Sequence, residues 1–137
     1  MPSSKLVSIV ACSGEEIPEG TVSRVAVWKA FGKLMSPNIV TTCLPLFLAG
    51  QQQEREFVWM HPTVTIDGCD KRCAERAIRK FGGTPKATFV VTDIEKETGL
   101  TPKSRVYLGE EGEKLADTIA EKITGEVERI CSKGNKE

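Results

Sequence analysis

Short runs rich in β-branched residues alternate with longer runs of helical periodicity along this chain, and this alternation limits the possible folds more than any other feature. The strand-like runs cover residues 5–11, 38–42, 63–66 and 86–92. The helix-like runs cover 21–35, 51–59, 70–81 and 110–131, and 44–50 is an apolar segment that forms either a buried loop or a short helix. Strands that alternate with helices are typical of a parallel sheet with helical crossovers.

The chain has 137 residues, which is enough to bury one hydrophobic core without help from a metal or from disulfides. We therefore predict a single α/β domain over residues 1–132, with a mostly parallel four-stranded sheet flanked by helices in a three-layer, Rossmann-like or flavodoxin-like arrangement. Thr21 is the predicted N-cap of the first helix. The polar segment 95–103 is predicted to be a loop, and 133–137 a flexible tail.

The last helix-like run has one continuous apolar face and a cysteine at its end. The face repeats every three or four residues, as in an amphipathic helix that packs on a core. Its members are Leu115, Ile119, Ile123, Val127 and Ile130. Cys131 lies about 100° round the helix from Ile130, beside a polar end that is expected to fray. We therefore predict that Cys131 is a partly exposed free thiol and not a metal ligand.

Charge and cysteine content argue against several classes of partner and location. The chain has 19 acidic and 19 basic residues, so it has no net positive charge for binding nucleic acid or an anionic membrane surface. No run approaches the ~20 apolar residues of a membrane span. The five cysteines are an odd number, the chain is not rich in cysteine, and no secretory signal is recognised, so we expect reduced thiols in the cytoplasm.

Three cysteines, Cys12, Cys43 and Cys69, come at or just after the end of a strand-like run. Because the carboxyl ends of parallel strands lie on one edge of a sheet, where the cofactors of open α/β folds bind, these thiols are expected to share that edge. Cys73 follows Cys69 at a spacing that is common where two thiolates hold one zinc ion. Four thiolates in tetrahedral reach suit zinc, with an iron–sulfur centre as second choice. Burial as a small apolar residue is an equally good account of Cys43.

The segment Asp67–Cys73 runs from the end of a strand into the start of a helix. Gly68 is expected to give the backbone freedom for the sharp turn, and Asp67 to cap the following helix rather than to hydrogen-bond to metal ligands. A thiol at a helix start gains from free backbone N–H groups and from the helix dipole, which favour the thiolate. A second function therefore stays open, a thiol oxidoreductase or sulfur-transfer protein in which Cys69 reacts and Cys73 resolves.

Common enzyme templates fit the chain poorly. A cysteine phosphatase carries an arginine at the end of its phosphate loop, but the corresponding positions after Cys69 and Cys12 are Glu75 and Pro18. No glycine-rich nucleotide motif or dinucleotide fingerprint is present. His61 is the only histidine and is predicted to be a surface residue rather than a ligand. We therefore predict no catalytic residues and lean against an enzyme.

Two cysteine motifs in this chain together resemble those of the DGC-domain family. The first is Cys12-Ser13-Gly14 after a strand, and the second is Ile66-Asp67-Gly68-Cys69 followed by Cys73-Ala74. That family is described as binding zinc through four cysteines, so the resemblance implies one zinc ion per chain, held by Cys12, Cys43, Cys69 and Cys73. A closed four-thiolate shell leaves no position for catalytic water, and the expected role is metal storage, delivery or an interaction platform. An iron–sulfur electron carrier is a further alternative.

Overall fold

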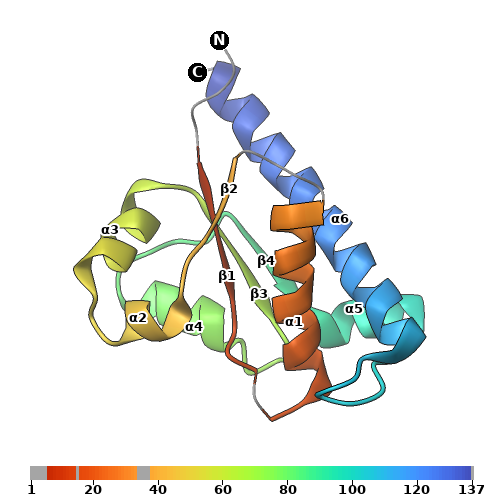
Figure 1. Ribbon diagram of the computed structural model, residues 1–137. Coiled ribbons are helices and arrows are strands. Elements are labelled where there is room, and N and C mark those ends of the chain that lie inside the picture. Colours follow the sequence, from red (N-terminus) through yellow and green to blue (C-terminus); the bar gives the residue numbers. More distant parts are fainter. Residues whose placement is uncertain (1–5, 15, 34–37, 137) are drawn as a thin grey trace.

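The computed structural model describes residues 6–14, 16–33 and 38–136. Within these residues, the centre of the molecule is a sheet of four parallel strands in the order β2-β1-β3-β4 (Figure 1). The strands are β1 (Val7–Ala11), β2 (Ile39–Thr41), β3 (Thr63–Asp67) and β4 (Ala87–Val90). The predicted α/β fold is therefore confirmed. The direction of the crossovers reverses between β1 and β3, which is where open sheets of this kind bind their ligands.

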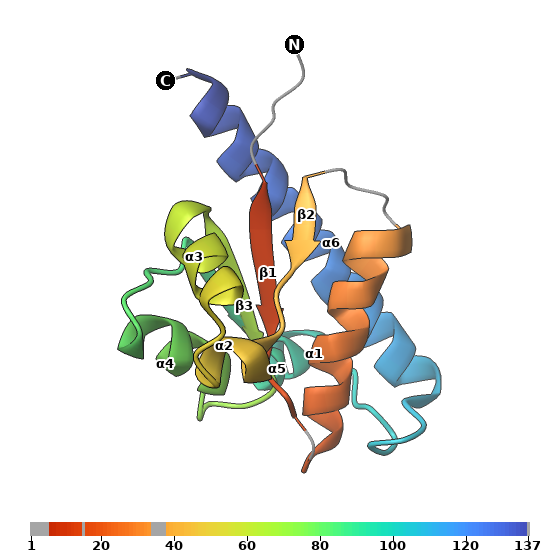
Figure 2. The same ribbon diagram turned by 60° about the vertical axis from the view of Figure 1, so that its left-hand side comes forward.

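Helices cover both faces of the sheet, which gives three layers (Figures 1 and 2). One face carries α1 (Pro18–Trp28), which continues into a π-helical turn (Lys29–Lys33), together with α5 (Val91–Thr98) and α6 (Gly109–Lys136). The other face carries α2 (Leu44–Leu48), α3 (Gln52–Met60) and α4 (Cys73–Lys80). Side chains of β1 alternate between the two faces. Ile9 packs in a larger core with α1 and α6, whereas Val10 packs in a smaller core with α2, α3 and α4.

The apolar face of α6 packs on the larger core as predicted, with each of its five members 7 % exposed or less. The predicted exposure of Cys131 is wrong, because this residue is 8 % exposed and belongs to the same core; that it is not a metal ligand stays a prediction. Cys131 lies four residues after Val127, so the two residues share a face of the helix. The helix also continues past Cys131 to Lys136. The flexible tail predicted for 133–137 stays a prediction.

The first helix begins earlier than predicted. α1 starts at Pro18, and proline is a favoured first helical residue because its missing N–H has no helical partner there. Thr21 therefore lies inside the helix, and its hydroxyl donates to the Arg105 carbonyl oxygen (2.8 Å) instead of capping. Met35, the predicted end of this helix, lies outside the described residues.

A helix, α5, directly follows β4 where a longer strand and then a loop are predicted. The strand ends at Val90, and residues 95–98 of the predicted loop are helical. Val91 and Ile94 are buried in the larger core, so one face of this otherwise polar segment is anchored on it. Packing therefore outweighs the polar composition from which the loop was predicted.

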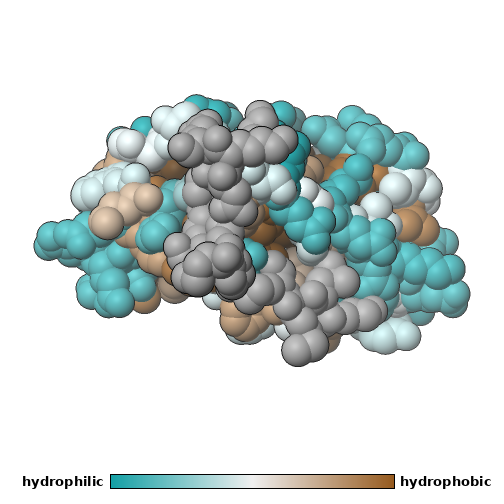
Figure 3. Space-filling model, turned by 90° about the horizontal axis from the view of Figure 1, so that it is seen from above, coloured by the Kyte–Doolittle hydropathy of each residue, from teal (hydrophilic) through white to brown (hydrophobic). Residues whose placement is uncertain are grey.

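Figure 3 views the molecule from the end where the strands begin. Hydrophilic residues cover much of the visible surface there, and hydrophobic residues form smaller patches. In the part of the chain that the structure describes, no helix is both long enough and apolar enough to cross a membrane. The carboxyl ends of the strands lie at the opposite end of the molecule, where α1 begins (Figure 1).

Two carboxyl groups meet where α1 packs on α5. The pKa of Glu95 is raised to about 7, first by burial and then by a hydrogen bond and charge repulsion from Glu19. An unfolded chain leaves this carboxyl near its ordinary pKa of 4.5. The folded protein therefore keeps a proton that the unfolded chain releases between these two values. The resulting stabilisation is present below about pH 4.5 and is lost as the pH rises through about 7.

The Glu95→Gln variant should lose this pH dependence, because glutamine keeps a donor towards Glu19 and cannot ionise. We expect the stability of the variant relative to the parent protein to rise between pH 5 and pH 8, measured as the free energy of unfolding in urea. Glu97→Gln, an exposed change on the same helix, is the control. If the free energies of unfolding of Glu95→Gln and the parent differed by the same amount at both pH values, the raised pKa of Glu95 would be contradicted.

The packing of α6 gives a second prediction. Ile123 has no exposed surface, so Ile123→Ala should lower the free energy of unfolding by about 2–5 kcal/mol through lost burial and the cavity it leaves. The exposed neighbour Glu121 provides the control, because Glu121→Ala should change stability by less than about 0.5 kcal/mol. Urea unfolding followed by circular dichroism measures both. Similar losses for the two variants would show that α6 does not pack through this face.

Candidate metal centre

A cavity of about 450 Å³ lies at the carboxyl ends of β1 and β3, where the direction of the crossovers changes. Cys12, which follows β1, lines this cavity together with Cys69 and Cys73, which follow β3. Parallel pairing aligns the two strand ends, because Ala11 lies beside Ile66. The structure therefore brings three of the four predicted ligands to one cavity, on the edge of the sheet expected from the sequence.

Three glycines bring backbone segments into contact beside this cavity. A Cβ atom on Gly14 would lie 2.4 Å from the Gly20 Cα, and a Cβ atom on Gly68 would lie 2.8 Å from the Gly20 nitrogen. Three segments approach this closely only because each has a glycine at the contact: the loop after β1, the first turn of α1 and the loop after β3. The role predicted for Gly68 is wrong in one respect: φ is positive at Gly14 but not at Gly68, so Gly68 is required for space and not for its conformational freedom.

Cys12 is the innermost of the three thiols, with 7 % of its surface exposed. Its Sγ accepts a hydrogen bond from the Gly68 N–H (3.3 Å) and lies 3.5 Å from the Ser23 Oγ. The Ser23 hydroxyl also donates to the Gly20 carbonyl oxygen (2.6 Å), and in its contact with Cys12 either side chain can be the donor. Burial raises the pKa of Cys12, and the bonds with Ser23 and Gly68 oppose this rise only in part. A metal ion that binds here must displace the Cys12 proton.

Cys69 and Cys73 lie on either side of a turn that leads into α4. Cys69 is half-buried, and Cys73, the first residue of the helix, is exposed. The Arg72 N–H donates to the Cys69 carbonyl oxygen (3.1 Å), and Arg72 has a φ of 52°, in the left-handed region. This conformation does not continue a right-handed helix. The helix predicted over 70–81 therefore starts later, at Cys73.

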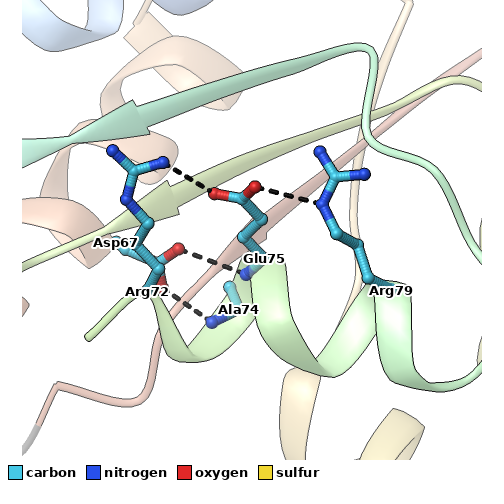
Figure 4. A network of polar contacts seen from close by, with 5 residues as sticks. All are labelled: Asp67, Arg72, Ala74, Glu75 and Arg79. Carbon is cyan, nitrogen blue, oxygen red and sulfur yellow. Dashed lines mark hydrogen bonds and ion pairs between the residues drawn. The ribbon is translucent and has the colours of Figure 1, made fainter. Parts of the chain in front are cut away.

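Asp67 caps the start of α4 (Figure 4). Its Oδ1 accepts a hydrogen bond from the Ala74 N–H (2.7 Å), and its Oδ2 accepts one from the Glu75 N–H (3.2 Å). The predicted capping role of Asp67 is therefore confirmed. Burial raises the pKa of Asp67, and these two backbone N–H groups oppose the rise. Because the carboxylate takes both donors, two of the free N–H groups expected to favour a thiolate at this helix start are already in use.

Glu75 ties two arginines to the surface of α4. Its Oε1 accepts a hydrogen bond from Arg72 and its Oε2 accepts one from Arg79, each at 3.1 Å (Figure 4). Burial of the Glu75 carboxyl favours its neutral form, but the hydrogen bonds from Arg79 and Arg72 outweigh it, and the pKa of Glu75 is lowered. The side chain of Arg72, which lies in the turn between Cys69 and Cys73, is therefore held by the ionised carboxylate of Glu75 in the first turn of α4.

Cys43 does not line the cavity that the other three predicted ligands share. It is exposed at the start of α2 and lines a neighbouring cavity of about 480 Å³, which it shares with Cys12, Arg24 and Glu54. The strand order explains this position: β2 and β3 flank β1 on opposite sides, so the strands before Cys43 and Cys69 are about 10 Å apart. Within the described residues, no three His, Cys, Asp or Glu side chains are grouped closely enough to hold a metal ion as they stand.

Two residues that shape the cavity were not singled out from the sequence. Ser23 lies on the buried face of α1, and no motif marks a serine that bonds to a thiol of another element. Gly20 could have been noticed in the sequence, because it and Gly14 are the two glycines at the ends of the segment 14–20. The predicted non-ligand His61 lies elsewhere, with its ring centroid 4.2 Å from that of Phe57, and it lines neither of the two cysteine cavities described above.

The glycine contact predicts the effect of one added methyl group. Gly68→Ala should lower the free energy of unfolding by about 2–4 kcal/mol and speed the reaction of Cys12 with a thiol reagent, because its Cβ would push the loop away from Gly20. Gly125→Ala is the matched control: Gly125 is exposed on α6 with open space around it, so alanine should be neutral or stabilise by up to about 1 kcal/mol. A Gly68→Ala variant as stable as the parent would contradict this account.

Comparison with curated proteins gives no match, and neither does comparison with solved structures. The family model of the DGC domain matches residues 8–123, which is most of the chain. The match includes all four cysteines predicted to bind metal and excludes Cys131. This protein is therefore a member of the DGC domain family.

Proposed function

We propose that the protein binds one zinc ion through Cys12, Cys69 and Cys73, with Cys43 as the fourth ligand, and that it stores or delivers this metal or presents it to a partner. The observation that carries the proposal is the meeting of three thiols, from the ends of two neighbouring parallel strands, on one cavity. The membership of the DGC domain family is consistent with it.

The donor chemistry of this cavity fits zinc. Thiolates are preferred zinc ligands, and two thiols a few residues apart are common in zinc sites. The N–H of Gly68 points to the sulfur of Cys12, and hydrogen bonds of this kind stabilise a ligand and set its orientation. Zinc binds the thiolate form of cysteine, so each thiol loses its proton when the metal binds and regains it when the metal leaves. Acid should therefore promote metal release.

Loading of the proposed site requires thiols to move, because within the described residues no three potential ligands are grouped closely enough for a metal ion. Cys43 must approach past the end of β1, and the exposed Cys73 must turn towards Cys12. Both hydrophobic cores consist mainly of apolar side chains of the sheet and helices, and of the four proposed ligands only Cys12 belongs to one of them. Metal loss should therefore leave the fold intact, as storage or delivery requires.

A cytoplasmic location is part of the same proposal. None of the five cysteines, all of which lie in the described part of the chain, forms a disulfide. Reduced thiols persist in the cytoplasm, where they remain available to a metal. The proposal assigns no catalytic residue.

Metal analysis of single variants tests the ligand set. We expect about one zinc per chain in protein purified with reductant and without chelator, and a sharp loss of zinc in Cys12→Ser, Cys69→Ser and Cys73→Ser. Cys43→Ser should also lose affinity; full retention would reduce the set to three cysteines. Cys131→Ala is the matched control, chosen over serine because Cys131 is buried in the larger core, and it should keep its zinc.

Two other results would replace the proposal. A coloured protein that contains iron would indicate an iron–sulfur electron carrier. Protein that holds no transition metal but has reactive thiols would indicate thiol chemistry alone. Circular dichroism before and after chelation separates a reversible site from a structural one, because collapse of the helical signal on metal removal would contradict storage or delivery.

A further inference from the structure

We propose that Cys73 and Cys69 form a dithiol that small anionic disulfides oxidise, with Cys73 as the attacking thiol and Cys69 as the resolving thiol, and that this oxidation empties the metal site. The oxidation stands on the geometry of the turn before α4. Only its consequence for the metal rests on the proposed function.

The three thiols of the cavity differ in accessibility, and this sets the order of the reaction. Cys73 is exposed, Cys69 is half-buried and Cys12 is 7 % exposed behind them. A disulfide that enters from solvent therefore meets Cys73 first. Cys12 is also engaged with Ser23 and with the Gly68 N–H. These positions reverse the roles expected from the sequence, in which Cys69 reacts first and Cys73 resolves.

The turn between the two thiols favours a second step at Cys69. Both cysteines line the same cavity. The chain between them forms a tight turn, in which the Arg72 N–H donates to the Cys69 carbonyl oxygen. Arg72 adopts a left-handed conformation, which is unfavourable for a residue with a side chain. A short segment held in such a conformation is typical of sites that switch between two states.

The charges around Cys73 favour an anionic substrate. The segment 70–80 carries five exposed basic residues against Asp70 and Glu75, although the whole chain is neutral. Lys71 and Arg72 line the cavity itself, and Glu75 is already engaged by two arginines. Two acidic residues line the cavity as well, Glu16 from the loop before α1 and the buried Asp67, so the preference comes from the exposed basic side chains on the α4 side. The volume of about 450 Å³ is within the range of small-molecule sites.

The chemistry balances with the disulfide as the oxidant. The Cys73 thiolate attacks one sulfur of the disulfide, so that a mixed disulfide forms on Cys73, the original S–S bond breaks and one thiolate leaves. The Cys69 thiolate then attacks the Cys73 sulfur, the Cys69–Cys73 bond forms, and the second thiolate leaves. The protein gives up two electrons, and the two released thiolates take up the protons of the two cysteines. Because zinc binds thiolates and not disulfide sulfur, two of the proposed ligands are lost together.

The experiment uses full-length protein with Cys43→Ala, which removes the other exposed thiol of the cysteine edge. The reduced, metal-free protein is treated anaerobically with glutathione disulfide, which is anionic, or with cystamine, which is cationic. Trypsin cleaves after Lys71 and Arg72, so a Cys69–Cys73 disulfide joins two separate peptides and mass spectrometry identifies it. We expect this disulfide to form several-fold faster with glutathione disulfide than with cystamine, and added salt should narrow the difference.

Matched variants test each assignment. Cys69→Ser should accumulate glutathione on Cys73, and Cys73→Ser should react much more slowly. Lys71→Glu should reduce the preference for glutathione disulfide, whereas Lys122→Glu, an exposed change on α6, should leave it unchanged. Circular dichroism of every variant confirms that it is folded before the rates are compared.

Several outcomes would overturn the inference. They are faster reaction with cystamine, a mixed disulfide on Cys73 that Cys69 never resolves, or first attack at Cys69. The same treatment of zinc-loaded parent protein, which keeps Cys43, tests the consequence with a zinc indicator in solution, and retention of zinc after the disulfide has formed would contradict it. If the protein never binds zinc but the disulfide still forms, then the proposed function fails and the dithiol chemistry stands.

Discussion

The backbone contact of Gly20 with Gly14 and Gly68 is the constraint on which the cysteine site depends. It joins three segments that follow or start separate elements, namely the loop after β1, the first turn of α1 and the loop after β3. The same contact keeps the N–H of Gly68 within 3.3 Å of the Cys12 sulfur. A side chain at any of these positions would separate the segments and with them the thiols. The triplet Asp67-Gly68-Cys69 thus combines three physical roles: a helix cap, a place of close approach and a thiol.

The sequence predicted the edge of the sheet but not the side of β1 on which each thiol lies. Runs of β-branched residues locate strands well because they fit the pleated, buried surface of a sheet, and parallel strands put their carboxyl ends together. Strand order depends on packing between elements distant in sequence, and no single run encodes it. The order β2-β1-β3 places Cys43 and Cys69 on opposite sides of Cys12. The predicted set of four thiols is therefore split between two neighbouring cavities.

Other differences between prediction and structure have local physical causes. Cys131 was judged by its neighbour Ile130, whereas its position four residues after Val127 puts it in the core. Residues 95–98 were assigned to a loop by their polarity, whereas two buried side chains at the start of α5 anchor the helix that contains them. Asp67 was correctly predicted as a cap, although it lies at the end of β3 and not at the N-cap position, which is Arg72. The turn after β3 brings its carboxylate to the Ala74 and Glu75 N–H groups. Local rules were sufficient here because both partners belong to one strand–turn–helix segment.

The two hydrophobic cores include different helices, and this determines which parts of the cysteine site can move most easily. The larger core joins the sheet to α1, α5 and α6, and it holds the Gly20 side of the cavity in place. The smaller core holds α2, α3 and α4, and its helices α2 and α4 begin at the exposed thiols Cys43 and Cys73. Moving an element costs free energy in proportion to the apolar contacts it must break. Rearrangement of the thiols is therefore cheapest on the α2 and α4 side, where the accessible cysteines lie. Cys12 also packs in the smaller core, but its N–H bonds to the Ile66 carbonyl oxygen and its sulfur accepts the Gly68 N–H, so it stays anchored to β3.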